Sequence, residues 1–126
     1  MKIKIASILV AFTLAFVSNS VFADSIVESY TCKLNEGKKT EELHKINGKW
    51  LKWIRANVSK DISSSVGIAV VGKQDMFLFV DTYPDLNTWA AAQTALDSDA
   101  AKELEDIFSD VSECTENRLW KFEPTK

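Results

Sequence analysis

Residues 66–80 read VGIAVVGKQDMFLFV, two apolar runs separated by a polar turn, and this stretch decides the fold. The turn at residues 72–75 predicts an antiparallel hairpin. Such sheets usually keep one face wet and alternate apolar with polar residues, but here both faces are apolar. If Val71 pairs with Met76, one face carries Gly67, Ala69, Val71, Met76, Leu78 and Val80, and the other carries Val66, Ile68, Val70, Phe77 and Phe79.

An apolar sheet face has to be buried against another layer. A chain of this length supplies helices for one face only, so the second face requires a cover from outside the fold. That cover is a partner subunit, a ligand, or both. We expect a homodimer that forms through the open face of the sheet.

The N-terminus has the three parts of a secretory signal peptide. Lys2 and Lys4 precede an apolar stretch over residues 5–17, and Ala23 ends a V-x-A cleavage site. Cleavage after Ala23 leaves residues 24–126 as a single domain that is periplasmic or secreted. The alternative is an uncleaved membrane anchor, although the stretch is shorter than the ~20 residues that span a bilayer.

The charge balance excludes two classes of partner. The formal net charge is −3, and it becomes −5 when the two lysines of the signal peptide are removed. An acidic domain has no long-range attraction to nucleic acid or to anionic membrane. We therefore expect no nucleic acid, and no membrane once the signal is cleaved.

The cysteine count predicts one disulfide. Cys32 and Cys114 both lie in the exported part, and an even count in an oxidising compartment favours a bridge. The alternative is two free or redox-active thiols, although the C-x-x-C spacing of exchange sites is absent. One histidine and two distant cysteines form no zinc-type set, so we expect no metal, and no other cofactor.

The remaining pattern predicts an α+β domain. We expect strands at 26–34 and 118–122 beside the hairpin, and helices at 40–57, 86–96 and 100–111, the last two forming one helix broken at 97–99. Thr40 and Asp85 are the expected helix caps, and residues 61–65 a polar link. This order is the ferredoxin-like βαββαβ arrangement with a four-stranded antiparallel sheet. Its first and last strands are neighbours, which would bring Cys32 close to Cys114.

Residues 80–92 read VDTYPDLNTWAAA, which looks like the strand-to-helix passage of the dimeric alpha-beta barrel superfamily. With the element order and the hairpin, the mature region resembles the antibiotic-biosynthesis-monooxygenase-like and stress-responsive barrel proteins of that group. The resemblance implies two sheets facing each other across a two-fold axis, and a pocket between each sheet and its own helices. Members include cofactor-free oxygenases, haem-degrading enzymes, isomerases and proteins with no known activity, so the fold does not decide the function.

The first predicted helix carries polar groups at its apolar stripe. At about 100° per residue, Asn47 falls inside the stripe and His44 at its edge. An unpaired carboxamide there would cost about 1 to 3 kcal/mol. Asn47 is therefore either a core amide with backbone partners or part of a small-molecule site.

We predict a site at this stripe. Its candidate catalytic residues are His44 and Asn47, and its candidate ligand-binding residues are Tyr30, Trp50, Trp53 and Trp89. The alternatives are a boundary imidazole without a role and tryptophans that only fill the core. Asp81 ends the face of Phe77 and Phe79, so it is either a partly buried acid with a raised pKa or a turn-forming aspartate.

Three functions stay open at this stage. The first is an exported dimer that binds a small apolar or aromatic molecule without established catalysis. The second is a cofactor-independent monooxygenase or isomerase that acts on a small aromatic or apolar substrate through His44 and Asn47. The third is a structural or interaction module whose pocket is filled by its own side chains.

Overall fold

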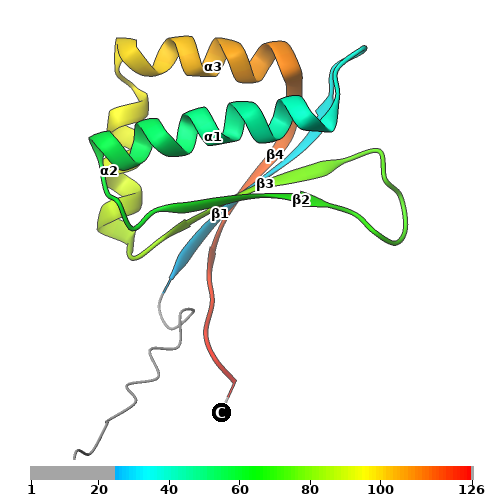
Figure 1. Ribbon diagram of the computed structural model, residues 1–126. Helices are drawn as coiled ribbons and strands as arrows, with labels where there is room; N and C mark the ends of the chain where they lie inside the picture. Colours follow the sequence, from blue (N-terminus) through cyan, green and yellow to red (C-terminus); the bar gives the residue numbers. More distant parts are fainter. Residues whose placement is uncertain (1–24, 126) are drawn as a thin grey trace, which may run out of the picture.

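The computed structural model describes residues 25–125, which form a four-stranded antiparallel sheet with helices on one face (Figure 1). The elements are β1 (Ile26–Leu34), α1 (Thr40–Asn57), β2 (Ser63–Ile68), β3 (Phe77–Tyr83), α2 (Leu86–Leu96), α3 (Asp99–Val111) and β4 (Ser112–Lys121). This order confirms the ferredoxin-like prediction. The predicted signal peptide lies outside the described residues, and within residues 25–125 no helix is long and apolar enough to cross a membrane.

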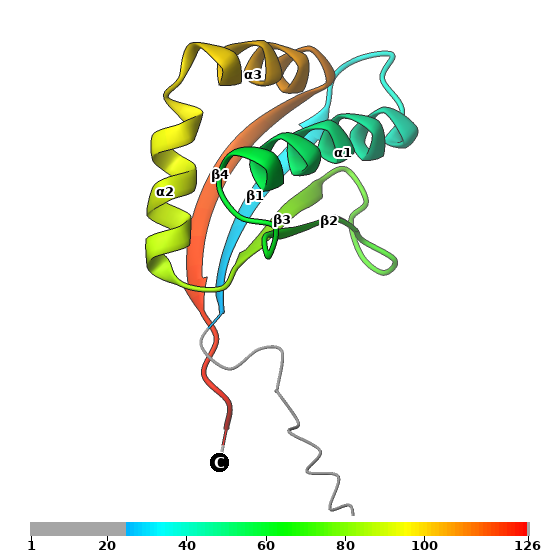
Figure 2. The same cartoon turned by 60° about the vertical axis from the view of Figure 1, so that its left-hand side comes forward.

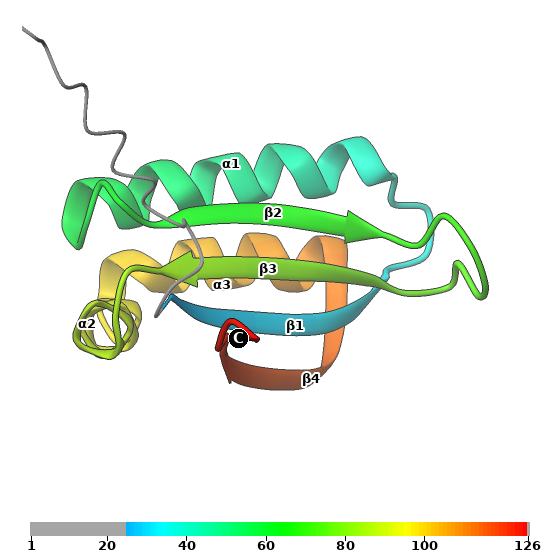
Figure 3. The same cartoon turned by 90° about the horizontal axis from the view of Figure 1, so that it is seen from below.

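The sheet has the strand order β2-β3-β1-β4, with β1 and β3 at its centre. Figure 3 looks onto the face without helices, where the four strands lie in this order. Helices α1 and α3 run across the other face, and α2 turns away from the axis of α3 (Figure 2). The predicted break in the second helix is confirmed, because residues 97–98 separate α2 from α3.

The helix starts follow local capping chemistry. Asp85 caps α2 as predicted, since its Oδ1 accepts a hydrogen bond from the backbone N–H of Thr88 at 2.7 Å. Helix α1 is capped one residue earlier than predicted. The N–H of Lys39 donates to Oε2 of Glu42 at 2.8 Å, so Thr40 is already the first helical residue.

The hairpin extends differently from the prediction. Ile68 pairs with Phe77, so β2 occupies residues 63–68 rather than 66–71, and Val70 and Val71 lie in the connecting loop with 87% and 88% of their surface exposed. The serine segment expected as a link is a strand instead, because Ser64 pairs with Asp81 through both its backbone register and its side chain. The register shift is an even number of residues, so each residue keeps its predicted face.

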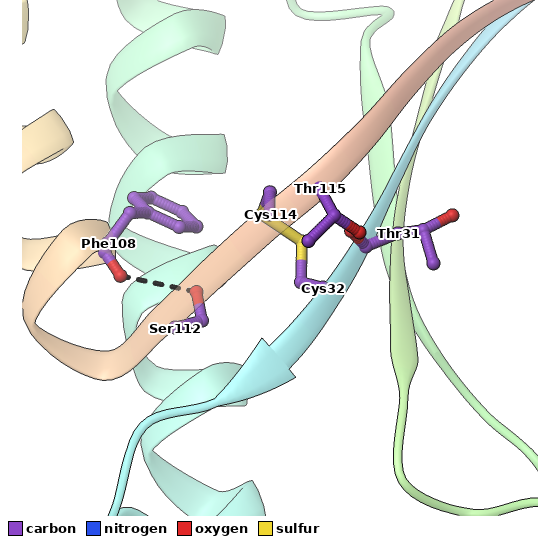
Figure 4. Close-up of a disulfide and its surroundings, with 6 residues drawn as sticks. All are labelled: Thr31, Cys32, Phe108, Ser112, Cys114 and Thr115. Atoms are coloured by element: carbon purple, nitrogen blue, oxygen red, sulfur yellow. Dashed lines mark hydrogen bonds between the residues drawn. A yellow bond between two sulfur atoms is a disulfide. The ribbon is translucent and has the colours of Figure 1, made fainter.

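Strand β4 begins six residues before its predicted start. It follows α3 directly and pairs with β1 along its whole length. Its first half is polar because β4 is an edge strand with exposed side chains, and apolar composition therefore did not mark it. Cys114 lies opposite Cys32 in this pairing, and their sulfur atoms are bonded at 2.02 Å (Figure 4), which confirms the predicted disulfide.

The two faces of the sheet are covered unequally. On the helix side Phe77 and Phe79 are only 5% and 4% exposed, whereas Leu78 on the open side is 38% exposed. Trp120 lies on the open side opposite Val27, and its Nε1 donates to Ser29 Oγ at 2.8 Å. The prediction of an apolar open face is correct for β3 but wrong for β2, whose open-face residues are Ser63, Ser65 and Gly67.

The helix side contains two clusters of buried apolar residues. One is centred on Trp50, Ile54 and Tyr83, and the other on Leu43, Phe77 and Phe79. Phe108 of α3 packs against both. The core therefore consists of two clusters on the same face of the sheet, and α3 contacts both of them.

Candidate functional site

A cavity of about 370 Å³ lies between the sheet and the helices. It is lined by Tyr30, Asn47, Trp50, Phe79, Asp81, Leu96, Leu104, Glu105, Phe108, Ser109 and Cys114. Trp50 belongs to one core cluster and Phe79 to the other, so the cavity lies where the two clusters meet. Its volume falls within the range of about 300 to 1,000 Å³ that is typical of small-molecule sites.

A chain of hydrogen bonds crosses from α1 to β3 beside this cavity. Nδ2 of Asn47 donates to Ser64 Oγ at 2.9 Å, and Ser64 Oγ lies 2.5 Å from Oδ1 of Asp81. Because Asn47 donates to the serine oxygen, the single hydroxyl proton of Ser64 is available for Oδ1 of Asp81. Asn47 and Asp81 are 8% and 6% exposed. Asn47 is therefore a buried amide whose partner is a side chain, and it orients the serine toward the acid.

The pKa of Asp81 is raised from 3.8 to about 7. The largest cause is burial, which removes water from the charged form, and the negative charge of Glu28 adds to it, while the hydrogen bond from Ser64 acts in the opposite direction. This outcome agrees with the predicted buried acid rather than with the turn-forming aspartate. A carboxyl with a pKa near 7 can accept or donate a proton close to neutral pH.

Glu28 is the cross-strand neighbour of Asp81 and is 3% exposed. Its Oε2 accepts hydrogen bonds from Nε1 of Trp89 and Nε2 of Gln93, both at 3.1 Å, and from the hydroxyl of Tyr83 at 3.4 Å. Its Oε1 accepts from Nδ2 of Asn117 at 3.0 Å. These four donors come from α2, β3 and β4, so Glu28 joins three elements behind the cavity.

Two tyrosines surround the acids, and both have raised pKa values. Burial is the main cause for Tyr30 and for Tyr83, and the nearby charges of Glu28 and Asp81 add to it. Both phenols therefore keep their protons throughout the physiological pH range. Of Tyr30, Tyr83 and Asp81, only the Asp81 carboxyl has a pKa near neutral pH.

The structure brings together some of the predicted site residues. Tyr30, Asn47 and Trp50 line the cavity. Trp53 and Trp89 are half-buried and pack against the core cluster around Trp50, outside the lining. Trp89 instead holds Glu28, as described above.

His44, the other predicted catalytic residue, is exposed on α1 and is absent from the lining of the cavity. A residue at the edge of an apolar helix stripe can lie either in the core or in solvent, and His44 lies in solvent. Nothing in the geometry connects the imidazole with Asp81.

Glu28 and Ser64 were not among the predicted site residues. Glu28 carries a signal that could have revealed it, because it has the same parity as Ile26, Tyr30 and Cys32 in a strand whose inward side is otherwise apolar. Ser64 carries no such signal, since a serine run is typical of a loop. Within residues 25–125 no group of three or more His, Cys, Asp or Glu side chains is placed to hold a metal ion.

Comparison with known proteins gives likenesses in structure only. No family model matches the sequence, and no curated protein matches it. A solved structure of a mutant of SnoaB, a cofactor-independent oxygenase from Streptomyces nogalater, is similar with a TM-score of 0.61 at 11% identity, covering 82% of this chain and 97% of that one. A NIPSNAP-like domain protein from Burkholderia xenovorans has a TM-score of 0.55 at 16% identity, covering 82% and 91%.

A third similar structure is a dimeric protein of unknown function and ferredoxin-like fold from Bacteroides fragilis, with a TM-score of 0.51 at 14% identity, covering 78% of this chain and 96% of that one. At these identities the likeness concerns the fold. The chain thus shares the ferredoxin-like fold of these proteins along nearly their whole length.

The raised pKa of Asp81 predicts a pH-dependent stability. Because the folded pKa of about 7 exceeds the ordinary value of 3.8, the contribution of the neutral acid is complete below pH 4 and is lost as pH rises through 7. Between pH 5 and pH 8 the free energy of unfolding should fall by about 2 to 3 kcal/mol relative to Asp81→Asn, whose amide does not titrate. Urea titrations at each pH measure the difference. Asp106→Asn, which changes an exposed acid of α3, should follow the wild type, and parallel curves for the wild type and Asp81→Asn would contradict the prediction.

Proposed function

We propose that the protein is an exported homodimer that binds a small apolar or aromatic molecule in the cavity between α1, α3 and the sheet. The observation that carries this proposal is a cavity of about 370 Å³ with aromatic walls and the polar chain Asn47, Ser64 and Asp81. Apolar walls provide most of the binding free energy through desolvation, and a few placed polar groups orient the ligand. The third function, an interaction module whose pocket is filled by its own side chains, is less consistent with this open cavity between the two core clusters.

The proposed export rests on the N-terminal pattern and on the disulfide. The charged, apolar and small-residue parts follow one another as in secretory signals. Disulfides persist in oxidising compartments, and the Cys32–Cys114 bridge is compatible with one. We therefore assign residues 1–23 to a signal peptide, residues 24–126 to a single domain, and the mature protein to the periplasm or the extracellular space.

The proposed dimer rests on the open face of the sheet. Leu78 and Trp120 lie on this face and are 38% and 43% exposed, so an interface formed here has apolar side chains to bury. One of the similar structures is described as a dimeric protein with the same fold. A second copy that packs its own open face here would bury both side chains in a symmetric interface.

A second candidate function is cofactor-independent oxygenation or isomerisation. It is favoured by the fold that the chain shares with SnoaB and by the acid beside the cavity. In its ionised form Asp81 could accept a proton from an enol or phenol, with Asn47 holding Ser64 in place. The predicted catalytic pair was His44 and Asn47, and of these two only Asn47 lines the cavity.

Binding is tested by filling the cavity. Leu104→Trp places a larger side chain in the lining and should weaken binding of one- and two-ring aromatic probes at least about tenfold, as measured by isothermal titration calorimetry. Leu86→Trp makes the same change at a residue that is 54% exposed and outside the lining, so it should bind like the wild type. The proposal fails if no probe binds the wild type, or if Leu104→Trp binds as tightly.

Turnover separates the two candidate functions. If the second holds, phenolic substrates cause oxygen uptake or isomerise, the rate rises with pH through about 7, and Asp81→Asn lowers kcat by at least about 100-fold. His44→Ala and Asn47→Ala then show which of the predicted catalytic residues contributes. A protein that binds the probes without oxygen uptake or isomerisation is a binding protein only.

The dimer is tested by placing a charge on the open face. Leu78→Asp should convert a two-chain particle into a monomer, because an interface would bury the carboxylate without a partner. Leu86→Asp introduces the same charge at an exposed position of α2 and should leave the dimer intact. Light scattering at micromolar concentrations measures the mass, and a monomeric wild type would refute the proposed interface.

A further inference from the structure

The cavity combines aromatic rings with acidic groups and lacks positive charge. Four of its lining residues are the aromatic side chains Tyr30, Trp50, Phe79 and Phe108, and two are the acids Asp81 and Glu105. No Lys, Arg or His is among the residues that line it in the described part of the chain. The ionisable lining groups of this site are therefore acidic, apart from the phenol of Tyr30, and none of them is basic.

The aromatic rings that line the cavity carry negative electrostatic potential on their faces. Phe79 and Phe108 pack edge to face, with ring centroids 5.2 Å apart and an interplanar angle of 75°. Aromatic faces attract cations, and clusters of such rings are the common recognition site for ammonium groups. An anionic ligand would meet the same faces unfavourably.

The charged groups around Asp81 favour a cation as well. Glu28 of β1 acts on Asp81 through its negative charge, and Glu105 of α3 is exposed at the cavity. The remaining groups that face Asp81 are neutral, namely Ser64 of β2, Asn47 of α1 and the phenols of Tyr30 and Tyr83. A buried carboxylate is costly unless an opposite charge pairs with it. The described residues around Asp81 provide no positive charge, and an ammonium ligand would provide one.

We propose that the ligand of this cavity is an aromatic or similarly flat apolar amine, whose protonated amino group pairs with Asp81 among the aromatic rings. This inference rests on the proposed binding function and names its ligand class. The apolar body fills the space between the two core clusters, and the ammonium group lies at the end of the Asn47, Ser64 and Asp81 chain.

Pairing with a cation has a consequence for protons. An ammonium group stabilises the carboxylate form of Asp81 and lowers its pKa, so the acid releases its proton when the amine binds. A neutral ligand of the same shape removes water from the carboxyl without compensating its charge, so it causes no release. Amine affinity should therefore increase with pH through about 7, the range in which Asp81 titrates.

The test compares three probes of similar shape, namely 2-phenylethylamine, 2-phenylethanol and 3-phenylpropanoate, by titration calorimetry at pH 5.5 and pH 8. We expect the amine to bind at least about tenfold more tightly than the alcohol at pH 8, the preference to shrink to about threefold or less at pH 5.5, and the propanoate to bind weakest. Asp81→Asn should remove the preference, and Asp106→Asn should keep it. Equal affinities of amine and alcohol for the wild type, or a preference that survives in Asp81→Asn, would overturn the inference.

A second measurement uses the wild type alone, so it holds even if Asp81→Asn does not fold. Titrations at pH 7 in buffers of different ionisation enthalpy should show release of about half a proton with the amine, as expected for a pKa of about 7. The alcohol should cause no release, and proton uptake instead where it removes water from the carboxyl. Amine binding without proton release would contradict the pairing. If only other aromatic probes bind, the amine assignment fails and the binding function stands, whereas the binding function itself fails if no probe binds.

Discussion

The register between β1 and β3 places two carboxyl groups, Glu28 and Asp81, opposite each other on the helix-covered face. Side chains alternate along a strand, so a slip of one residue would transfer the acid of the shifted strand to the open face and break its hydrogen bonds. The packing of the helix side depends on this pairing. Helix α2 is held to β1 through Trp89 and Glu28, and β2 contacts Asp81 through Ser64. The two acids thus help to determine where α2 and β2 lie on the sheet.

The two acids differ in the number of donors that reach them, and this difference separates their roles. Glu28 accepts four hydrogen bonds from three elements, and such a group acts as a structural junction. Asp81 accepts one side-chain hydrogen bond, from Ser64, while burial opposes its charge and raises its pKa to about 7. Perturbed acids of this kind concentrate at functional sites, because they change protonation where a ligand can use it. The cavity lies beside the acid that can change its charge.

The sequence predicted the elements with strong periodicity and missed those that depend on tertiary partners. Strand β1 has the predicted bounds, and helix α1 differs only in its cap, because an apolar alternation or stripe marks them. Strand β2 contains a serine run that only its partners Asp81 and Asn47 explain, and polar β4 is recognised only through its pairing with β1. Within the site, Asn47 and Trp50 were predicted from helical angle. The same angle placed His44 at the edge of the stripe, which does not specify core or solvent, and His44 is exposed.

A cavity and a buried acid both reduce stability, so this site requires compensation elsewhere in a small domain. The disulfide is placed to provide it. Cys114 lines the cavity, and its bond to Cys32 closes a loop with a sequence separation of 82 residues. In the chain-entropy model a loop of that length stabilises the fold by about 4 to 5 kcal/mol, which is similar to the roughly 4 kcal/mol that ionising Asp81 costs across its full shift. The bridge joins β1 to β4 at the lining of the cavity. It therefore holds these two strands together at a place where the cavity reduces packing.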